Sequence, residues 1–214
     1  MIIGLVCEGV TDVPIIQNVL IGHTGDTDLI VDRLPHLLDA THAVKPENLG
    51  GWNKVLKYIG TSDFQEAFQQ MDAVIVQIDT DVCQEFGVNR TDVNGRELEP
   101  AELIEEVKEA LIGRIGTEFY QIFDDRIIFA IAVDSIECWL LPLYYTDKRA
   151  AKHKNCVDTL NHNLRADGYT IDHKDVRIYE NLSAPYRKKK DLTSAVNKQA
   201  SLSYFVGQLS RLGA

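Results

Sequence analysis

Continuous apolar runs, without the alternation of a half-exposed strand, constrain the fold of this chain most strongly. They occupy residues 1–7, 73–78 and 126–133, and a weaker strand is expected over 28–34, before Pro35. Runs of this length are typical of strands that are covered on both faces, as in parallel sheets. Segments with helical apolar spacing lie between them. The sequence therefore predicts an α/β fold, with a mostly parallel central sheet and helices on both faces.

The C-terminal part of the chain differs from the rest in charge. The chain has 22 basic and 32 acidic residues, a net charge of −10, but residues 148–214 carry 13 basic and 6 acidic groups, or +7. Residues 1–147 carry 9 basic and 26 acidic groups, or −17. No Gly/Pro/Ser-rich linker separates the two parts. We expect residues 1–145 to form the sheet domain, and 146–214 to be a basic α-rich elaboration packed on it that faces any phosphate-rich partner.

The four cysteines, Cys7, Cys83, Cys138 and Cys156, are far apart in the sequence. None forms a C-x-x-C pair or has a histidine at zinc spacing, so we expect buried free thiols in a reducing cytosol. No apolar run reaches the roughly 20 residues of a membrane span, and the N-terminal segment lacks the basic start of a signal peptide. The sequence thus predicts a cytoplasmic protein without a membrane partner.

Acidic residues follow three of the predicted strands. Glu8 closes the first strand, Asp79 and Asp81 close the central one, and Glu137 lies just past the last. Ligands of open α/β sheets bind at the carboxyl ends of the strands. Clustered carboxylates repel one another unless water, protons or a cation compensates, and oxygen ligands select hard ions such as Mg²⁺ or Mn²⁺. The pattern predicts a site for one or two divalent ions.

Three residues near these strand ends also have purely structural interpretations. Asp12 either caps the helix after the first strand or completes the metal site. Ser135 either caps the helical segment 136–141 or orients the metal ligands without binding the ion itself. Glu137 lies in the first turn of that segment, where an acid interacts favourably with the helix dipole without any catalysis. The acids that close the first and central strands have no such alternative.

The motifs EGVTD at 8–12 and DTD at 79–81, each after an apolar strand, resemble the TOPRIM domain of topoisomerases, bacterial primases and several nucleases. Nucleases of the overcoming-lysogenization-defect (OLD) family carry a second acid four residues after the first Glu, and a Ser-x-Glu after the next strand. Asp12, Ser135 and Glu137 occupy those places here. The likeness covers roughly residues 1–145.

The same family carries a lysine further along the chain, a place that Lys188, Lys189 or Lys190 would take here. The WLLP after Glu137 and the PYRKKKD segment are similar to small stand-alone RloB-like TOPRIM proteins, which are often encoded beside ATPases in defence islands. The resemblance implies that Lys188 or Lys190 neutralises charge on a scissile phosphate during catalysis. Arg187 and the three lysines would also bind the nucleic-acid backbone.

The function implied is a Mg²⁺- or Mn²⁺-dependent nuclease that hydrolyses phosphodiester bonds in DNA or RNA, as an effector of phage defence. Glu8, Asp79 and Asp81 would hold one ion, and Asp12 with Glu137 would help hold a second, as in two-metal catalysis.

Two other functions fit the same residues. One is a non-catalytic TOPRIM-like subunit that binds nucleic acid or an ATPase partner, and the other is a metal-dependent phosphotransferase or nucleotidyl transferase. The chain contains no Walker A motif, so any ATPase would be a separate chain. The sequence leaves open the oligomeric state, the choice between DNA and RNA, and endo- or exonuclease action.

Overall fold

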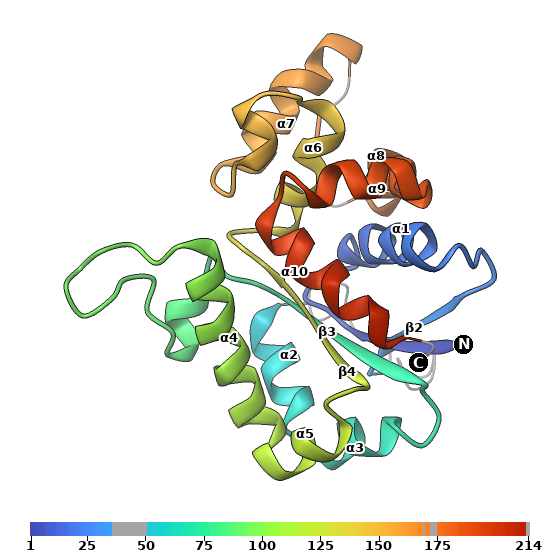
Figure 1. Cartoon of the computed structure of the whole chain (residues 1–214), viewed down its shortest axis with the longest axis vertical. Coiled ribbons are helices and arrows are strands. Elements are labelled where there is room, and N and C mark those ends of the chain that lie inside the picture. Colours follow the sequence, from blue (N-terminus) through green and yellow to red (C-terminus); the bar gives the residue numbers. More distant parts are fainter. Residues whose placement is uncertain (36–50, 169, 172–174, 213–214) are drawn as a thin grey trace.

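A parallel sheet lies at the centre of the computed structural model, which describes residues 1–35, 51–168, 170–171 and 175–212. Its strands are β1 (Ile2–Val6), β2 (Ile30–Leu34), β3 (Ala73–Asp79) and β4 (Ile127–Ala132), in the order β2-β1-β3-β4 (Figure 1). All three pairings are parallel. The predicted fold class is therefore confirmed, with each strand beginning within two residues of its expected start.

Helices cover both faces of this sheet. Those on one face are α1 (Asp12–Thr24), α6 (Leu141–Tyr144), α7 (Cys156–Leu164), α8 (Val176–Ser183), α9 (Lys189–Val196) and α10 (Ala200–Gln208). Those on the other are α2 (Trp52–Ile59), α3 (Ser62–Ala67), α4 (Pro100–Ile115) and α5 (Thr117–Phe123). Short 3₁₀ turns join them: η2 (Cys83–Phe86), η3 (Ile136–Leu140), η4 (Lys148–Ala151), η5 (Arg165–Asp167), η6 (Ala184–Arg187) and η7 (Leu209–Arg211).

Alternation along the strands divides the core into two layers. Ile3 and Leu5 of β1 pack in the layer that holds α1, whereas Val74 and Val76 of β3 pack in the layer of α2 to α5. The basic C-terminal part supplies much of the first layer, including the fully buried ring of Phe205. Residues 146–214 thus complete the core of one face.

Helix α10 also covers the edge of the sheet at β4. The Gln208 side chain accepts a hydrogen bond from the Phe129 amide at 3.0 Å and donates one to the Phe129 carbonyl at 2.8 Å. A side-chain amide thus replaces a neighbouring strand at this point, which satisfies backbone groups that an open edge would expose.

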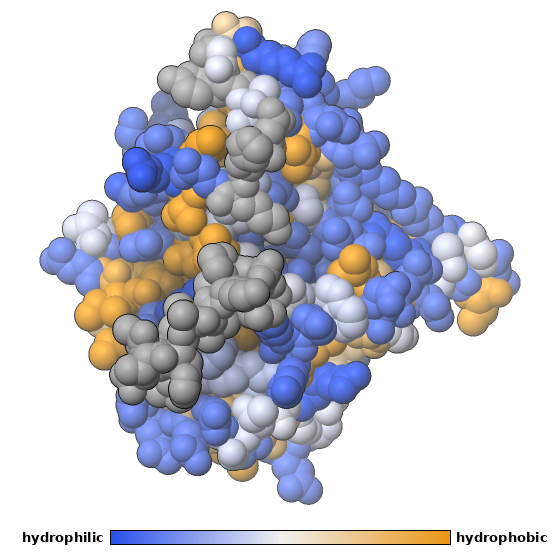
Figure 2. All heavy atoms as spheres, turned by 180° about the vertical axis from the view of Figure 1, so that it is seen from behind, coloured by the Kyte–Doolittle hydropathy of each residue, from blue (hydrophilic) through white to orange (hydrophobic). Residues whose placement is uncertain are grey.

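Hydrophilic side chains dominate the molecular face that Figure 2 shows. Within the described residues no helix is long and apolar enough to cross a membrane. Large apolar side chains are exposed at a few places, among them Met1, Ile2 and Ile30 where β1 and β2 begin, and Val93 in the loop before α4.

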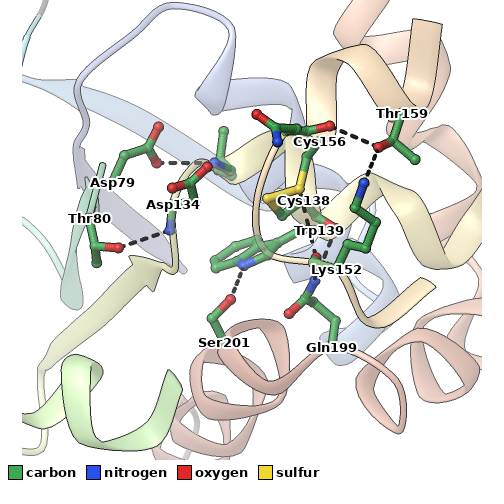
Figure 3. Close-up of a disulfide and its surroundings, with 12 residues drawn as sticks. Asp79, Thr80, Asp134, Cys138, Trp139, Lys152, Cys156, Thr159, Gln199 and Ser201 are labelled. Carbon is green, nitrogen blue, oxygen red and sulfur yellow. Dashed lines mark hydrogen bonds between the residues drawn. A yellow bond between two sulfur atoms is a disulfide. The ribbon is translucent and has the colours of Figure 1, made fainter. Parts of the chain in front are cut away.

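The prediction of four free thiols is wrong for two of the cysteines. Cys138 of η3 and Cys156 of α7 form a disulfide, with their Cα atoms 5.0 Å apart (Figure 3). They are 18 residues apart in the chain and come together because η3 and α7 pack against each other, which no local spacing indicates. Cys7 and Cys83 are buried free thiols, as expected.

Candidate metal centre

The strand order reverses between β1 and β3, so the carboxyl ends of these two central strands flank a crevice. The chain leaves β1 toward β2 on one side, and β3 pairs with β1 on the other. This switch point is where open parallel sheets bind their ligands. Glu8 lies two residues beyond β1, and Asp79 is the last residue of β3.

A closed set of three hydrogen bonds fixes the first two acids relative to each other. The Glu8 amide donates to Gln77 Oε1 at 3.0 Å, and Gln77 Nε2 donates to Asp79 Oδ1 at 2.9 Å. The Asp79 amide then donates to Glu8 Oε1 at 2.7 Å. Gln77 is completely buried, so its amide has no competing water. Both carboxylates are therefore held in defined positions before any ligand arrives.

Asp12 joins the same group from the start of α1. Its Oδ2 accepts a hydrogen bond from the Gly9 amide at 2.6 Å, and Thr11 rather than Asp12 occupies the N-cap position. The buried Asp12 carboxylate thus stabilises the turn between β1 and α1, and it lies close enough to Asp79 to raise that residue's pKa. The prediction that Asp12 caps the helix is therefore wrong, and its role as a metal ligand stays a prediction.

Asp81 leaves the end of β3 beside a second acid, Asp134. The Asp81 amide donates to the Asp134 carbonyl at 3.0 Å. The Asp134 amide donates to Thr80 Oγ1 at 2.8 Å (Figure 3). Asp134 has a left-handed backbone, with a φ of 66°. Arg90 approaches from the loop after η2, with its guanidinium 2.8 Å from the Thr80 carbonyl and 3.5 Å from Asp134 Oδ1.

The segment after β4 brings Ser135 and Glu137 to the same edge. Ser135 occupies the N-cap position of η3, but its side chain makes no capping hydrogen bond. The Ile136 amide instead donates to Asp79 Oδ1 at 3.1 Å. Glu137 Oε1 accepts a hydrogen bond from the hydroxyl of Tyr179 on α8 at 2.8 Å. An amide and a phenol from two separate elements therefore orient two carboxylates of the site.

A cavity of about 380 Å³ opens over these groups. Its walls come from the ends of β3 and β4, from η3 and from the first turn of α7. The lining residues are Asp79, Asp81, Asp134, Ser135, Glu137, Asn155, Cys156, Val157 and Asp158. Five of these nine are acidic, so the cavity is suited to a cation.

Burial and like charge act together on Asp79. Its pKa is raised well above the usual value for Asp, first by desolvation and then by the negative charges of Asp12, Glu8, Glu137 and Asp81. The pKa of Asp81 is also raised, again first by desolvation, while Arg90 opposes the shift. The other four predicted metal ligands therefore lie within electrostatic reach of the Asp79 carboxyl group.

The donor chemistry fits a hard divalent ion better than zinc, because the convergent groups are carboxylates. In the described part of the chain, however, no group of three or more His, Cys, Asp or Glu side chains is arranged to hold an ion as it stands. Binding would require the carboxylates to move together, which neutralisation of their mutual repulsion would favour.

The basic segment that the sequence analysis assigned to this site lies elsewhere. Arg187 donates to Asn18 Oδ1 at 2.6 Å, halfway along α1, and Lys189 lies near enough to His23 to lower the pKa of its imidazole, an effect second to desolvation. His23 is eleven residues beyond Asp12 on α1, about 16 Å along the helix axis. The structure does not bring Lys188, Lys189 or Lys190 beside the carboxylates.

The site also contains residues that were not predicted from the sequence, among them Gln77, Arg90, Asp134, Asp158 and Tyr179. Gln77 had a visible signal, because it is a polar side chain inside the otherwise apolar β3. Asp134 also had one, since it follows β4 directly. Arg90 lies in a polar loop and Tyr179 in a distant helix, and only the tertiary fold places them here.

Comparisons with known proteins add no family assignment. No protein-family model matches the chain, and no curated protein or solved structure matches it significantly. The resemblance to TOPRIM proteins accordingly remains a prediction from the sequence.

Proposed function

We propose that this protein is a Mg²⁺- or Mn²⁺-dependent phosphodiesterase that cleaves nucleic acid. The observation that carries the proposal is the convergence of Glu8, Asp12, Asp79, Asp81 and Glu137 at the switch point of a parallel sheet, where burial first and then the neighbouring carboxylates raise the pKa of Asp79. Carboxyl groups with raised pKa values are typical of functional sites, and positive charge bound there would stabilise their ionised forms. A divalent ion supplies that charge and can activate both water and phosphate.

Each carboxylate has a part in this proposal. Glu8, Asp79 and Asp81 would hold one ion, and Asp12 with Glu137 would help to hold a second. Gln77 fixes the separation of Glu8 and Asp79, so that less reorganisation is needed when an ion binds.

Arg90 replaces the lysines of 188–190 as the cation of the proposed site, because its guanidinium lies beside Asp134 and Thr80. There it can offset negative charge that develops on a phosphate bound over Asp81. A role in phage defence and a separate ATPase partner remain parts of the proposal that rest on the resemblance. A cytoplasmic location stays a prediction from the sequence, and the Cys138–Cys156 disulfide counts against the reducing compartment on which that prediction partly rested.

A cleavage assay tests the proposal. Wild-type protein should cleave DNA or RNA when Mg²⁺ or Mn²⁺ is present, and an Asp79→Asn/Asp81→Asn variant should lose at least about 10²-fold in rate. The matched control is Asp125→Asn, which removes an exposed carboxylate away from the site and should cleave like the wild type. Equal cleavage by the wild type and the double variant would sink the assignment.

The same preparations separate the alternatives. A phosphotransferase or nucleotidyl transferase would move a phosphate or nucleotide to an acceptor without cutting a nucleic-acid chain. A non-catalytic subunit would bind nucleic acid or an ATPase and cleave nothing with either metal ion.

A further inference from the structure

We propose that residues 148–154, named here the basic rim, bind the phosphate backbone of a nucleic acid and lead it into the acidic cavity. This inference rests on the proposed function and assigns the substrate-binding surface to a segment other than 187–190. The rim has the sequence KRAAKHK, with four cations, one histidine and no acid. It is the most concentrated basic stretch that adjoins the candidate metal centre.

The rim leads directly into the cavity wall. Asn155, Cys156, Val157 and Asp158 follow it in sequence, and all four line the cavity. In Figure 1 the loop before α7 and the loop before α4 lie on the same side of the molecule, where the strands β3 and β4 end. An ion pair between Lys154 and Glu97 connects these two loops. Residues 155–158 thus connect the rim to the cavity that Asp79 and Asp81 also line.

Buried contacts hold the backbone of the rim in place. Gln199, which is 2% exposed, donates to the Lys152 carbonyl at 2.9 Å and to the Cys138 carbonyl at 3.2 Å (Figure 3). Ala150 is buried in the core, and the disulfide fixes Cys156 just beyond the rim. The cations thus project from a rigid base, which reduces the entropy cost of binding a polyanion.

Two rim cations already have partners. Lys154 pairs with Glu97, both about half exposed, and an exposed pair of this kind contributes at most about 1 kcal/mol, so a phosphate can exchange for the carboxylate at little cost. Arg149 is held more firmly, because its guanidinium bonds to both oxygens of Asp147, at 3.0 and 2.6 Å, and lies over the Tyr145 ring. Lys152 is held by Thr159 Oγ1 at 2.8 Å, a neutral acceptor that leaves its charge uncompensated.

Charge complementarity explains why such a rim is needed. The cavity carries five carboxylates, and a phosphate backbone would be repelled by them unless cations stood at the entrance. Metal ions in the cavity would neutralise the negative charge of the scissile phosphate only. The phosphates on either side of it along the strand need cations from the protein. Among the described residues, Lys188, Lys189 and Lys190 do not line the cavity, and Lys189 lies near His23 at the far end of α1.

The test compares two triple variants that remove the same charge. Lys148, Lys152 and Lys154 are changed to Gln in one protein, and Lys188, Lys189 and Lys190 are changed to Gln in the other. Both are made in an Asp79→Asn background, so that cleavage does not disturb binding. Fluorescence anisotropy measures the affinity for a short labelled DNA strand, for its RNA equivalent and for a DNA duplex between about 50 and 200 mM salt. Thermal unfolding checks that each variant is folded.

The rim variant should bind at least about tenfold more weakly at low salt, with a salt slope smaller by about one unit for each lysine that contacts phosphate. The 188–190 variant should keep the affinity and the slope of its parent.

Equal weakening by both variants, or a larger effect of the 188–190 variant, would overturn the inference while leaving the proposed cleavage intact. The loss of cleavage in the Asp79→Asn/Asp81→Asn variant is measured in a separate assay, so the proposed function is tested independently of the binding surface. A parent protein that binds none of the three nucleic acids would also overturn the inference. A single Lys148→Gln variant, which alters no hydrogen bond described above, serves if the triple variant does not fold.

Discussion

At the scale of single residues, the site is organised by one neutral side chain. Gln77 is completely buried between two acids, accepting from the Glu8 amide and donating to Asp79 Oδ1. A buried amide in a strand interior is costly unless all its hydrogen bonds are made, and here both ends are used. The residue therefore has a role in arranging the carboxylates as well as in the stability of the sheet.

Replacing Gln77 by Leu should separate these two roles when it is compared with Gln208→Leu. Each change removes a buried glutamine with hydrogen bonds at both ends of its amide, so each should destabilise the fold by about 1–3 kcal/mol. Only Gln77→Leu should also weaken Mn²⁺ binding, by about 10–100-fold, because it frees the two carboxylates. Denaturant unfolding and calorimetric titration measure the two effects. A similar Mn²⁺ affinity in both variants would show that Gln77 contributes to the stability of the fold and not to metal binding.

Changing Asp79 to Asn should stabilise the metal-free protein, since it removes an ionisable group whose charged form is disfavoured first by burial and then by four neighbouring carboxylates. The amide oxygen can still accept from Gln77 and Ile136. Added Mn²⁺ should raise the unfolding midpoint of the wild type and leave that of the variant unchanged. Thermal unfolding with EDTA and with Mn²⁺ gives both numbers, with Asp125→Asn as the exposed control. A variant that unfolds earlier than the wild type in EDTA would argue against charge repulsion at this position.

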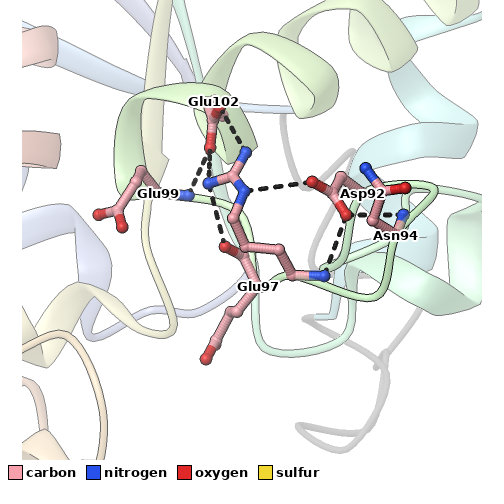
Figure 4. Close-up of polar contacts among 6 residues, drawn as sticks. Asp92, Asn94, Glu97, Glu99 and Glu102 are labelled. Carbon is pink, nitrogen blue, oxygen red and sulfur yellow. Dashed lines mark hydrogen bonds and ion pairs between the residues drawn. The ribbon is translucent and has the colours of Figure 1, made fainter.

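At the scale of elements, the sequence was most informative about the regular segments. The apolar runs identified the strands closely, because a strand that is buried on both faces is apolar along its whole length. The polar stretch 84–96 has the composition of a loop, which does not specify its conformation. In the structure Arg96 holds this loop against α4, because its guanidinium donates to Asp92 at 3.1 Å and to both carboxylate oxygens of Glu102 (Figure 4). Such contacts depend on how the loop turns back on α4, which polar composition does not specify.

The disulfide between η3 and α7 gives a prediction at this scale. Unfolded without reductant, the protein should show two reactive thiols, from Cys7 and Cys83, and four after reduction. In the folded protein Cys7 should react slowly at pH 8, because burial, together with the charge of Asp12, raises its pKa to about 12. Thiol titration with a chromogenic disulfide measures all three states. Four thiols before reduction would contradict the link.

Removing the link should also cost stability. A Cys138→Ser/Cys156→Ser variant should be less stable by about 3 kcal/mol, the value expected for a loop of this length. Because Glu137 precedes Cys138 and Asp158 follows Cys156, the variant should also bind Mn²⁺ less tightly. Unfolding curves of both oxidised proteins, compared with a Cys83→Ser control outside the link, provide the measurement.

At the scale of the whole molecule, the two parts of the chain share one core. Tyr186, Leu192 and Phe205 are buried in the same layer as Ile3 and Leu5 of the first strand, and Asn18 of α1 donates to Ser183 at 2.7 Å. The sequence predicted that residues 146–214 pack on the sheet domain, and in the structure they pack together with α1 and α6 on one face of the sheet.

A fragment ending at residue 145 should therefore not fold on its own. It would expose the α1 face of the sheet, including the apolar side chains that now contact α7 to α10. We expect no cooperative thermal transition and strong binding of a hydrophobic dye, whereas the full chain should unfold cooperatively. A cooperative transition of the fragment near that of the full chain would show that residues 146–214 are dispensable for the fold.

The candidate site was predictable in part, for a physical reason. Glu8, Asp79 and Asp81 end buried strands, and parallel strands bring their carboxyl ends to one edge, so their meeting follows from the fold class. The surroundings of these acids come from segments whose approach is set by packing: Arg90 from a loop and Tyr179 from α8. The lysines of 188–190 matched a motif in the sequence, but the path of α9 along α1 keeps them at a distance.

The central claim is that the carboxylates at this sheet edge form a site for divalent ions, and calorimetric titration with Mn²⁺ tests it most directly. We expect the metal-free wild type to bind one or two Mn²⁺ ions, and the Asp79→Asn/Asp81→Asn variant to bind none at the same concentrations. Saturable binding that disappears in the variant would support the proposed metal centre. No binding to the wild type, or equal binding to both proteins, would contradict it.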